Sequence, residues 1–374
     1  MKKVELLIFL LIWGGLNYYL GLRGWQSLGT LINGYGIIYW LVMVFLAAAY
    51  LIGRWLDLNY PGKVSDALTW IGSYWLGFFF YALLLVVSVD LIRWLDNKYG
   101  FLPPIFSDSA LTAIMIIILL LLLLIIGTWN AHRPIIRQYQ VAISKKAGEV
   151  KNLHVMMVSD IHLGNIIGNR RLTKLVKQVN ALKPEIIFLV GDIIDGDLRP
   201  FEKEDMGQTL QKLESNYGIY AVLGNHEYYG GQYKEIIKTL SSCGITLLRD
   251  QCVLIENSFY LLGRDDKYSR KRKPLSVLMA GIDRDLPTIV MDHNPIDIAE
   301  SYNNKVDLHL SGHTHTGQLS PINLITDKIF DLHWGYMIKD YLHIIVSNGF
   351  GTWGPPIRIG NRPEIVEIFI NFKN

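Results

Sequence analysis

Five short stretches of this 374-residue chain place aspartate, histidine or asparagine directly after apolar runs. The first is Asp160-Ile161-His162, which follows the apolar run from Val155 to Val158. The later four are Gly191-Asp192, Gly224-Asn225-His226-Glu227, Asp292-His293-Asn294 and Gly312-His313-Thr314-His315. Carboxylate and amide oxygens and imidazole nitrogens are common metal ligands. Because strands that end in such residues deliver them to the carboxyl edge of a sheet, the five stretches together predict a metal site.

Seven side chains in these stretches are candidate metal ligands: Asp160, His162, Asp192, Asn225, His293, His313 and His315. The set contains no cysteine, which favours Mn, Fe or Zn over metals that prefer soft ligands. The chain has two cysteines, Cys243 and Cys252, and they form no C-x-x-C pair, so a thiolate zinc site is not expected. They are either free thiols in a reducing compartment or a disulfide.

The five stretches resemble the calcineurin-like metallophosphoesterase family, whose pattern is D-x-H, G-D-x-x-D, G-N-H-[DE], a lone His and G-H-x-H. Here the pattern reads Asp160 to His162, Gly191 to Asp195, Gly224 to Glu227, His293, and Gly312 to His315. The tail from Asn348 to Arg358 is similar to the membrane-associated bacterial subgroup, although Thr316 stands where close relatives often have glycine. The resemblance extends over about residues 135–374 and implies a phosphoesterase with two divalent metal ions.

The resemblance also implies a role for each residue of the pattern. One metal would be held by Asp160, His162, Asp192 and His315. The second would be held by Asn225, His293 and His313, with Asp192 as the bridging carboxylate. His226 would be the general acid or a hydrogen-bond donor to the transition state. Asp195 is expected to support the ligands or to cap a helix rather than to bind metal.

The ligands must be positioned by a soluble domain, and the pattern after residue 130 predicts one. Residues 131–152 are expected to form a linker with a first strand near Ile135–Ile143, and residues 153–374 the metallophosphoesterase domain. Strand and helix patterns alternate up to about Leu240, and further short strands follow. The expected fold is a layered α/β sandwich of two sheets flanked by helices. The basic run Arg264–Lys273 is expected to be a solvated loop.

The first third of the chain has the composition of a membrane domain. Residues 1–130 contain 7 of the 36 Lys/Arg residues and 6 of the 33 Asp/Glu residues. Apolar stretches long enough to cross a bilayer core of about 30 Å lie near residues 4–22, 34–52, 68–92 and 110–129. We therefore predict a four-helix transmembrane domain over residues 1–130. Asp90 is expected at the membrane interface beside Arg93.

The basic residues of the short loops predict the orientation of these helices. With a cytoplasmic N-terminus, the inner side carries Lys2, Lys3, Arg54, Lys63, Arg133, Arg137, Lys145 and Lys146. The outer side then carries only Arg23, Arg93 and Lys98. Positive residues favour the cytoplasmic side. A multi-pass plasma-membrane protein with a cytoplasmic catalytic domain is therefore expected.

The sequence thus predicts a membrane-anchored, dinuclear metal-dependent phosphoesterase, acting on a phosphodiester or pyrophosphate bond. Its expected partners are the lipid bilayer and a phosphorylated small-molecule or lipid substrate. A net charge of +3 is too small to indicate nucleic-acid binding. The alternative is a catalytically silent metal-binding sensor or regulatory module on a membrane bundle, which the complete ligand set with His226 disfavours. A transporter with a regulatory domain is disfavoured because the spans contain few charged residues.

Overall fold

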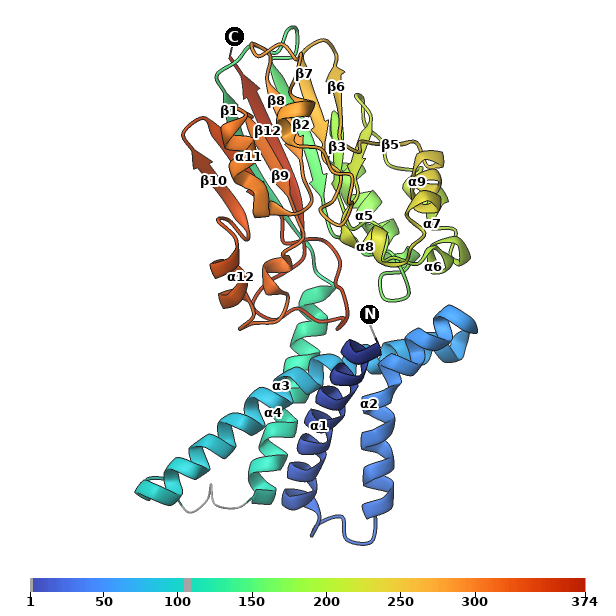
Figure 1. The fold of residues 1–374 in the computed structure, drawn as a ribbon, viewed down its shortest axis with the longest axis vertical. Coiled ribbons are helices and arrows are strands. Elements are labelled where there is room, and N and C mark those ends of the chain that lie inside the picture. The colour runs from blue at the N-terminus through green and yellow to red at the C-terminus, as the bar shows by residue number, and fades with distance from the viewer. Residues whose placement is uncertain (1–2, 104–108, 374) are drawn as a thin grey trace. The chain divides into compact units, whose positions relative to one another are not determined.

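The computed structural model describes residues 3–103 and 109–373, and these form two compact units (Figure 1). The first unit is the N-terminal part of the chain up to Trp129, together with Gly354–Ile357. The second unit contains Asn130–Trp353 and the chain from Arg358 onward.

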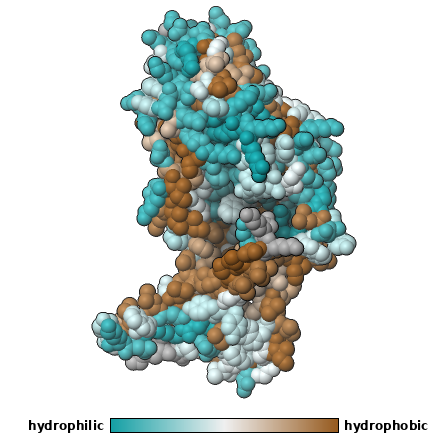
Figure 2. Space-filling view, viewed as in Figure 1, coloured by the Kyte–Doolittle hydropathy of each residue, from teal (hydrophilic) through white to brown (hydrophobic). Residues whose placement is uncertain are grey.

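Four long helices form the first unit: α1 (Lys3–Leu28), α2 (Gly36–Asn59), α3 (Lys63–Tyr99) and α4 (Ser109–Ala131). By length and composition, all four are able to cross a membrane. Only 11% to 28% of the apolar window of each helix is buried, and Figure 2 shows hydrophobic residues gathered on the surface of these helices. Because α-helices satisfy their own backbone hydrogen bonds, such apolar surfaces are suited to lipid.

Helices α2 and α3 pack closely because small residues stand at their contact. A Cβ added to Gly72 of α3 would overlap the backbone of Tyr50 on α2, and one added to Gly53 would crowd Thr69. Glycines at such positions let two helix backbones approach, as is common in membranes. A buried hydrogen bond of 3.2 Å from Thr69 Oγ1 to Asp57 Oδ2 also joins the two helices.

Asp90, expected beside Arg93, lines the same cavity as Arg93 but forms its ion pair with another helix. Asp90 forms an ion pair with Arg23 of α1, and Tyr19 Oη donates a second hydrogen bond to it. Arg93 instead donates from Nη2 to Thr112 Oγ1 of α4, over 3.2 Å. The partners of both residues therefore come from other helices, α1 for Asp90 and α4 for Arg93.

Two six-stranded sheets form the framework of the second unit. In spatial order, the first contains β1 (Ile135–Ile143), β12 (Glu364–Phe372), β2 (Asn152–Val158), β3 (Ile186–Val190), β4 (Ile219–Val222) and β5 (Ile245–Leu247). The second contains β10 (Gly335–Lys339), β11 (Leu342–Val346), β9 (Leu308–Ser311), β8 (Thr288–Met291), β7 (Phe259–Gly263) and β6 (Gln251–Ile255). Within each sheet the central neighbours β2-β3-β4 and β7-β8-β9 run parallel.

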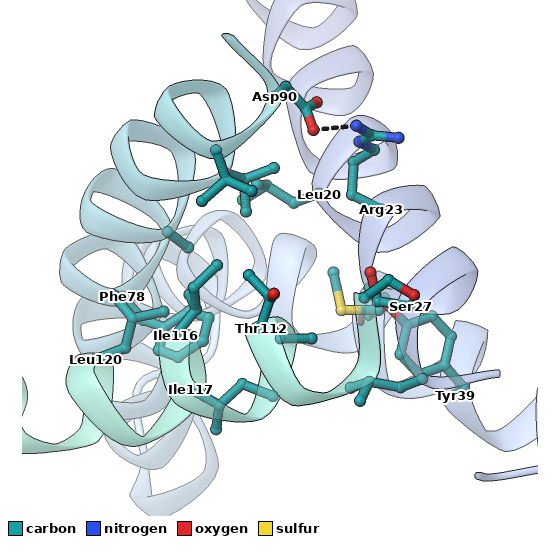
Figure 3. Close-up of a pocket in the computed structure, with 18 of the residues that line it drawn as sticks. Leu20, Arg23, Ser27, Tyr39, Phe78, Asp90, Thr112, Ile116, Ile117 and Leu120 are labelled. Atoms are coloured by element: carbon teal, nitrogen blue, oxygen red, sulfur yellow. Dashed lines mark hydrogen bonds and ion pairs between the residues drawn. The ribbon is translucent and has the colours of Figure 1, made fainter. Parts of the chain in front are cut away.

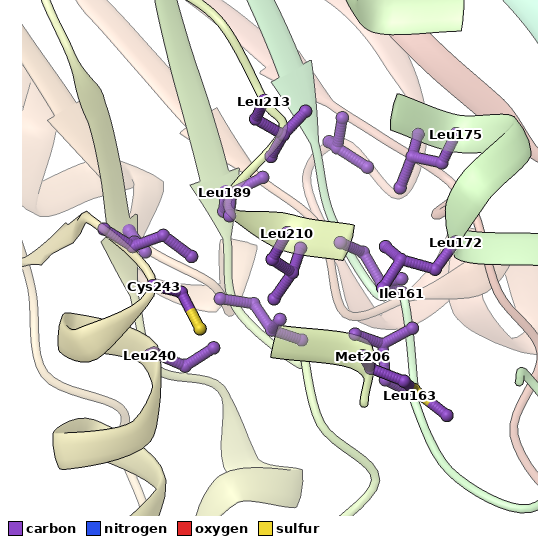
Figure 4. Packing of buried hydrophobic residues seen from close by; sticks show 14 of the residues in the cluster. Ile161, Leu163, Leu172, Leu175, Leu189, Met206, Leu210, Leu213, Leu240 and Cys243 are labelled. Carbon is purple, nitrogen blue, oxygen red and sulfur yellow. The ribbon is translucent and has the colours of Figure 1, made fainter. Parts of the chain in front are cut away.

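Both faces of the first sheet are buried, because successive apolar residues of its strands point alternately to one face and the other. On β2, Val155 and Met157 join the core between the two sheets, whereas Met156 and Val158 join a second core under the outer helices. That second core contains apolar side chains of α5 (Asn169–Ala181), α7 (Met206–Leu210) and α9 (Tyr233–Ser242) (Figure 4). A strand covered on both faces reads as a continuous apolar run, as β2 does. The predicted sandwich of two sheets flanked by helices is confirmed.

The remaining helices are short and lie in the connections. They are α6 (Leu198–Lys203), α8 (Asn225–Tyr229), α10 (Leu275–Leu278), α11 (Ile298–Asn303) and α12 (Asn323–Ile329), with 3₁₀ helices η2 (Pro295–Asp297) and η3 (His315–Gly317). Strands β5 and β10 were not predicted. Cys243 and Cys252 are free thiols.

The segment Arg264–Lys273 differs from the predicted solvated loop, because its beginning is buried. Arg264 is 2% exposed and pairs with Glu300 of α11 over 2.5 Å. Arg272 pairs with the buried Asp292 Oδ2, also over 2.5 Å. Asp292 directly follows β8, so a carboxylate at the end of a core strand holds the basic segment inward. The exposed residues of the segment are Lys267, Tyr268, Arg270, Lys271 and Lys273.

Candidate metal centre

The seven candidate ligands follow the carboxyl ends of five strands. Asp160 and His162 come after β2, Asp192 after β3 and Asn225 after β4. The other three follow strands of the second sheet, namely β8 for His293 and β9 for His313 and His315. Since β2, β3 and β4 are parallel neighbours, as are β8 and β9, their carboxyl ends meet at one edge of each sheet.

A first group consists of Asp160, His162 and His315, whose ligand atoms all lie within 4.8 Å of one another. The Nε2 atoms of His162 and His315 are 3.0 Å apart, and His315 Nε2 is 3.3 Å from Asp160 Oδ1. All three residues are buried. Two imidazoles and a carboxylate at these distances can hold one divalent ion.

A second group consists of Asp192, His293 and His313, again with ligand atoms within 4.8 Å of one another. Asp192 Oδ2 is 3.1 Å from His293 Nε2 and 3.8 Å from His162 Nε2 of the first group. One carboxylate therefore faces both groups. This is the position that a bridging ligand of a two-metal centre occupies.

Asn225, which follows β4, provides a test of whether a metal fits. Its Oδ1 atom is buried and has no hydrogen-bond partner among the described residues. A buried amide oxygen without a partner is costly, and coordination of a cation would satisfy it. The site therefore suits a metal of the kind that oxygen and imidazole ligands prefer.

The pKa shifts of three ligands suit metal binding, whereas burial raises the pKa of Asp160, and the Asp192 carboxylate, against the effect of burial, raises that of His293. Burial alone would raise the pKa of the Asp192 carboxyl, but the charge of His293 holds that pKa well below its usual range. Burial lowers the pKa of His313 to about 4 and holds that of His315 well below its usual range. Metal coordination requires ionised carboxylates and neutral imidazoles. Asp192, His313 and His315 are already in these forms near neutral pH.

The backbone around the ligands is strained. Asp160, His162, Asp192, His313 and His315 all have φ between 48° and 71°. For residues other than glycine this left-handed region costs of order 1–3 kcal/mol each, and it is found mostly at functional sites. Thr316, at the position where glycine was expected, also has a φ of 50°. A Cβ on Gly312 would overlap the Asp160 carboxylate, so the close approach of the two loops requires glycine there.

His226 lies beside the two groups and is oriented by Asp195. Its Nδ1 atom is 2.7 Å from Asp195 Oδ1, and its backbone N–H donates to Asp192 Oδ1 over 2.9 Å. Burial opposes the charged form of the ring, but the hydrogen bond to Asp195 and nearby carboxylates outweigh this and raise the pKa of His226 to about 9. A protonated imidazole is a proton donor.

Asp195 supports the site and does not cap a helix. Besides His226 it faces His162, whose Nδ1 atom is 3.4 Å from Asp195 Oδ1. The N-cap of the following helix α6 is Asp197, which accepts a hydrogen bond from the Arg199 N–H. Of the two roles expected for Asp195, the structure therefore supports only the first.

Two further residues position the ligands, although the sequence assigned them no role. The buried Glu227 carboxylate accepts hydrogen bonds from the backbone N–H groups of Asp192, Ile194 and Gly224, so it joins the loops after β3 and β4. Arg358 is fully buried, and its Nη2 atom is 3.1 Å from His315 Nδ1. Glu227 lies in the motif from Gly224 to Glu227, and Arg358 lies in the tail from Asn348 to Arg358. Their positions in these motifs could have identified them as functional residues.

The arrangement is shared with known proteins. The sequence profile described as "Calcineurin-like phosphoesterase" matches residues 153–317. An uncharacterized metallophosphoesterase of Aquifex aeolicus is 33% identical over 250 residues, which make up 64% of this chain and 92% of that protein. A "Transmembrane protein with metallophosphoesterase domain" of Bos taurus is 28% identical over 265 residues, 66% of this chain and 59% of that protein. An uncharacterized metallophosphoesterase of Helicobacter pylori J99 is 30% identical over 248 residues, 65% of each chain. The chain thus spans less than two thirds of the latter two proteins.

Proposed function

Because the chain belongs to the calcineurin-like phosphoesterase family, we propose that it hydrolyses a phosphodiester or pyrophosphate bond at a centre of two divalent metal ions. The observation that carries this proposal is the position of Asp192, whose carboxylate faces His162 on one side and His293 on the other. Calcineurin-like phosphoesterases use a dimetal centre. We also propose that the four apolar helices anchor this centre to a membrane.

Each candidate ligand has a place in this proposal. One ion is held by Asp160, His162, Asp192 and His315. The other is held by Asn225, His293, His313 and the shared Asp192. Two such ions, of Mn, Fe or Zn, activate water and neutralise charge on phosphoryl oxygens when bound. Glu227 and Arg358 act through the ligands, because they fix the loops and the His315 ring.

His226 is the proposed general acid. Asp195 occupies its Nδ1 side, so Nε2 is the atom from which a proton can pass to the leaving oxygen. The same contact keeps the ring protonated near neutral pH. Asp195 is therefore a positioning residue that also maintains the charge of the acid.

A lipid-type substrate is supported by apolar side chains next to the ligand loop. Helix α12 begins eight residues after His315, and its Leu324, Ile325 and Ile329 are all more than half exposed. Trp353 is 51% exposed, and its ring centroid is 6.5 Å from that of His226. Exposed apolar patches near a site are typical of surfaces that meet a lipid or another apolar partner. We propose a phosphate-bearing lipid or lipid-linked intermediate as the substrate.

Activity assays with the purified full chain test the proposal. With Mn²⁺ or Zn²⁺ present, we expect turnover of a soluble aryl phosphodiester, and faster turnover of a lipid phosphodiester or pyrophosphate in liposomes. A chain that starts at Asn130 retains β1, which pairs with β12, and all the ligands. It should keep the soluble activity and lose most of the liposome activity, because membrane anchoring raises the effective concentration of substrate. Equal activity of both chains on liposomes would exclude the lipid proposal, and metal binding without any turnover would favour the sensor function.

We further propose a plasma-membrane location with the catalytic unit in the cytoplasm, which rests on the charge bias of the loops. In a background without Cys243 and Cys252, an Arg270→Cys variant should resist a membrane-impermeant maleimide in intact cells and react after permeabilisation. Arg270 is exposed, so the reagent can reach it once inside. Tyr35→Cys, in the exposed connection between α1 and α2, should react in intact cells. The reverse pattern would place the catalytic unit outside.

A further inference from the structure

A cavity of about 310 Å³ lies within the helical unit and is lined by residues from all four helices (Figure 3). Most of its wall is apolar, including Leu20, Met43, Phe78, Ile116, Ile117 and Leu120. Its volume is at the lower end of the roughly 300–1,000 Å³ range of small-ligand pockets. The cavity therefore has room for part of one apolar chain, while the rest of a larger molecule would lie outside it.

One end of the cavity is charged. Arg23, Asp90 and Arg93 belong to its lining, and Figure 3 shows the Arg23–Asp90 ion pair at a distance from Phe78 and Leu120. Asp90 is the only acidic residue of the lining, and the two guanidinium groups outnumber it. Among the described residues, the polar end thus carries one positive charge more than negative charges.

The cavity follows from the way in which α3 and α4 are joined. Arg93 donates to Thr112 over 3.2 Å, and about five turns away Tyr74 Oη lies 3.1 Å from Thr128 Oγ1. Between these two contacts the helices face the cavity with apolar residues, among them the small side chains of Ala82 and Ala113. Apolar surfaces that enclose an empty volume lose dispersion contacts. A lipid chain would restore these contacts.

We propose that this cavity binds a membrane lipid with an anionic headgroup. The lipid chain fills the apolar part, and the headgroup lies against Arg23 and Arg93. The preference for a negative headgroup follows from charge complementarity, since Asp90 neutralises only one of the two guanidinium groups. Guanidinium groups also form strong, directed hydrogen bonds with phosphate oxygens.

The charged end of the cavity is remote from the point where the chain leaves the helices. Thr112 precedes Ala131, the last residue of α4, by 19 positions, which corresponds to about 28 Å at 1.5 Å per residue. This is close to the thickness of a bilayer core, about 30 Å. The headgroup therefore lies in the leaflet opposite the end of α4 from which the catalytic unit continues. The bound lipid is a structural or regulatory ligand and not the substrate, so this inference does not depend on the proposed function.

Native mass spectrometry of the full chain in detergent tests the charge preference. We would titrate it with phosphatidylglycerol or with phosphatidylcholine of identical acyl chains, and expect at least tenfold tighter binding of phosphatidylglycerol. Arg93→Gln should weaken phosphatidylglycerol binding about fivefold, the usual contribution of one basic residue near an anionic lipid. Lys98→Gln is the matched control, because it removes the same charge from the same helix outside the cavity. Equal binding of the two lipids, or equal effects of the two variants, would overturn the proposal.

A cavity-filling variant tests the location of the lipid. Ala113→Phe places a ring in the cavity and should reduce the binding of phosphatidylglycerol at least tenfold. Ile118→Phe adds a ring to an exposed position of α4 outside the cavity lining, and should leave binding unchanged. Helix content by circular dichroism, expected to match the native chain, shows that both variants fold. Undiminished binding by a folded Ala113→Phe variant would show that the lipid binds elsewhere.

Discussion

Replacement of Asp192 with alanine is expected to remove metal from both halves of the centre and to abolish hydrolysis. The Asp192 carboxylate faces a ligand of each group, with Oδ2 3.8 Å from His162 Nε2 and 3.1 Å from His293 Nε2. It also accepts the backbone N–H of His226, so its loss disturbs the loop that carries the proposed acid. Asp160 Oδ1 also faces a ligand of each group, but its distance to His293 Nε2 is longer, at 4.0 Å.

The measurement is elemental analysis of the purified chain together with the rate on a soluble phosphodiester. We expect two metal ions per native chain, at most one in Asp192→Ala, and a rate reduced by much more than the 10- to 100-fold that follows loss of an outer-shell partner. Asp327→Ala is a suitable control, because that carboxylate is exposed and outside the centre. It should keep both ions and the native rate. Two ions retained in Asp192→Ala would show that Asp192 is not the bridge.

Replacement of His226 with alanine is expected to separate catalysis from metal binding. Its ring is turned toward Asp195 and forms a third group of potential ligands with Asp195 and His162, but it belongs to neither of the groups that contain Asp192 or Asp160. His226→Ala should therefore retain both ions and lose turnover by roughly 10²- to 10⁴-fold, the usual contribution of a general acid. His154→Ala is the control, since His154 pairs with Glu367 on the first sheet, away from the ligands. A parallel loss of metal from His226→Ala would identify His226 as a ligand.

An Asp195→Asn variant tests whether the protonation state of His226 controls the pH dependence of the reaction. The Asp195 contact raises the pKa of His226 to about 9, so the acid loses its proton only at alkaline pH. Without the negative charge at Asp195, the His226 pKa should fall, and activity should be lost at a lower pH as the pH rises. We expect the basic limb of the kcat profile to move by about one pH unit or more. An unchanged basic limb would mean that another group controls it.

Local sequence patterns were sufficient for much of the catalytic unit. Strand β1 lies at the residues predicted for the first strand, and β3 is a continuous apolar run whose five residues are all buried. Such runs are informative because a strand buried on both faces needs apolar side chains throughout. Six of the seven candidate ligands are brought together in the two groups because each follows a strand, and parallel strands present their carboxyl ends at one edge. These are properties of short segments, so the sequence alone determines them.

Contacts between distant segments were decided only by the tertiary structure. Asp195 and His226 are 31 residues apart, Arg358 and His315 43, and Arg23 and Asp90 67. The buried position of Arg264 depends on Glu300 and Asp292, which the pattern of the loop itself does not indicate. The lipid cavity depends on four helices together, and each helix by itself shows only an apolar surface. Periodicity specifies which face of a segment is buried, but the partner on that face is determined by the packing of the whole chain.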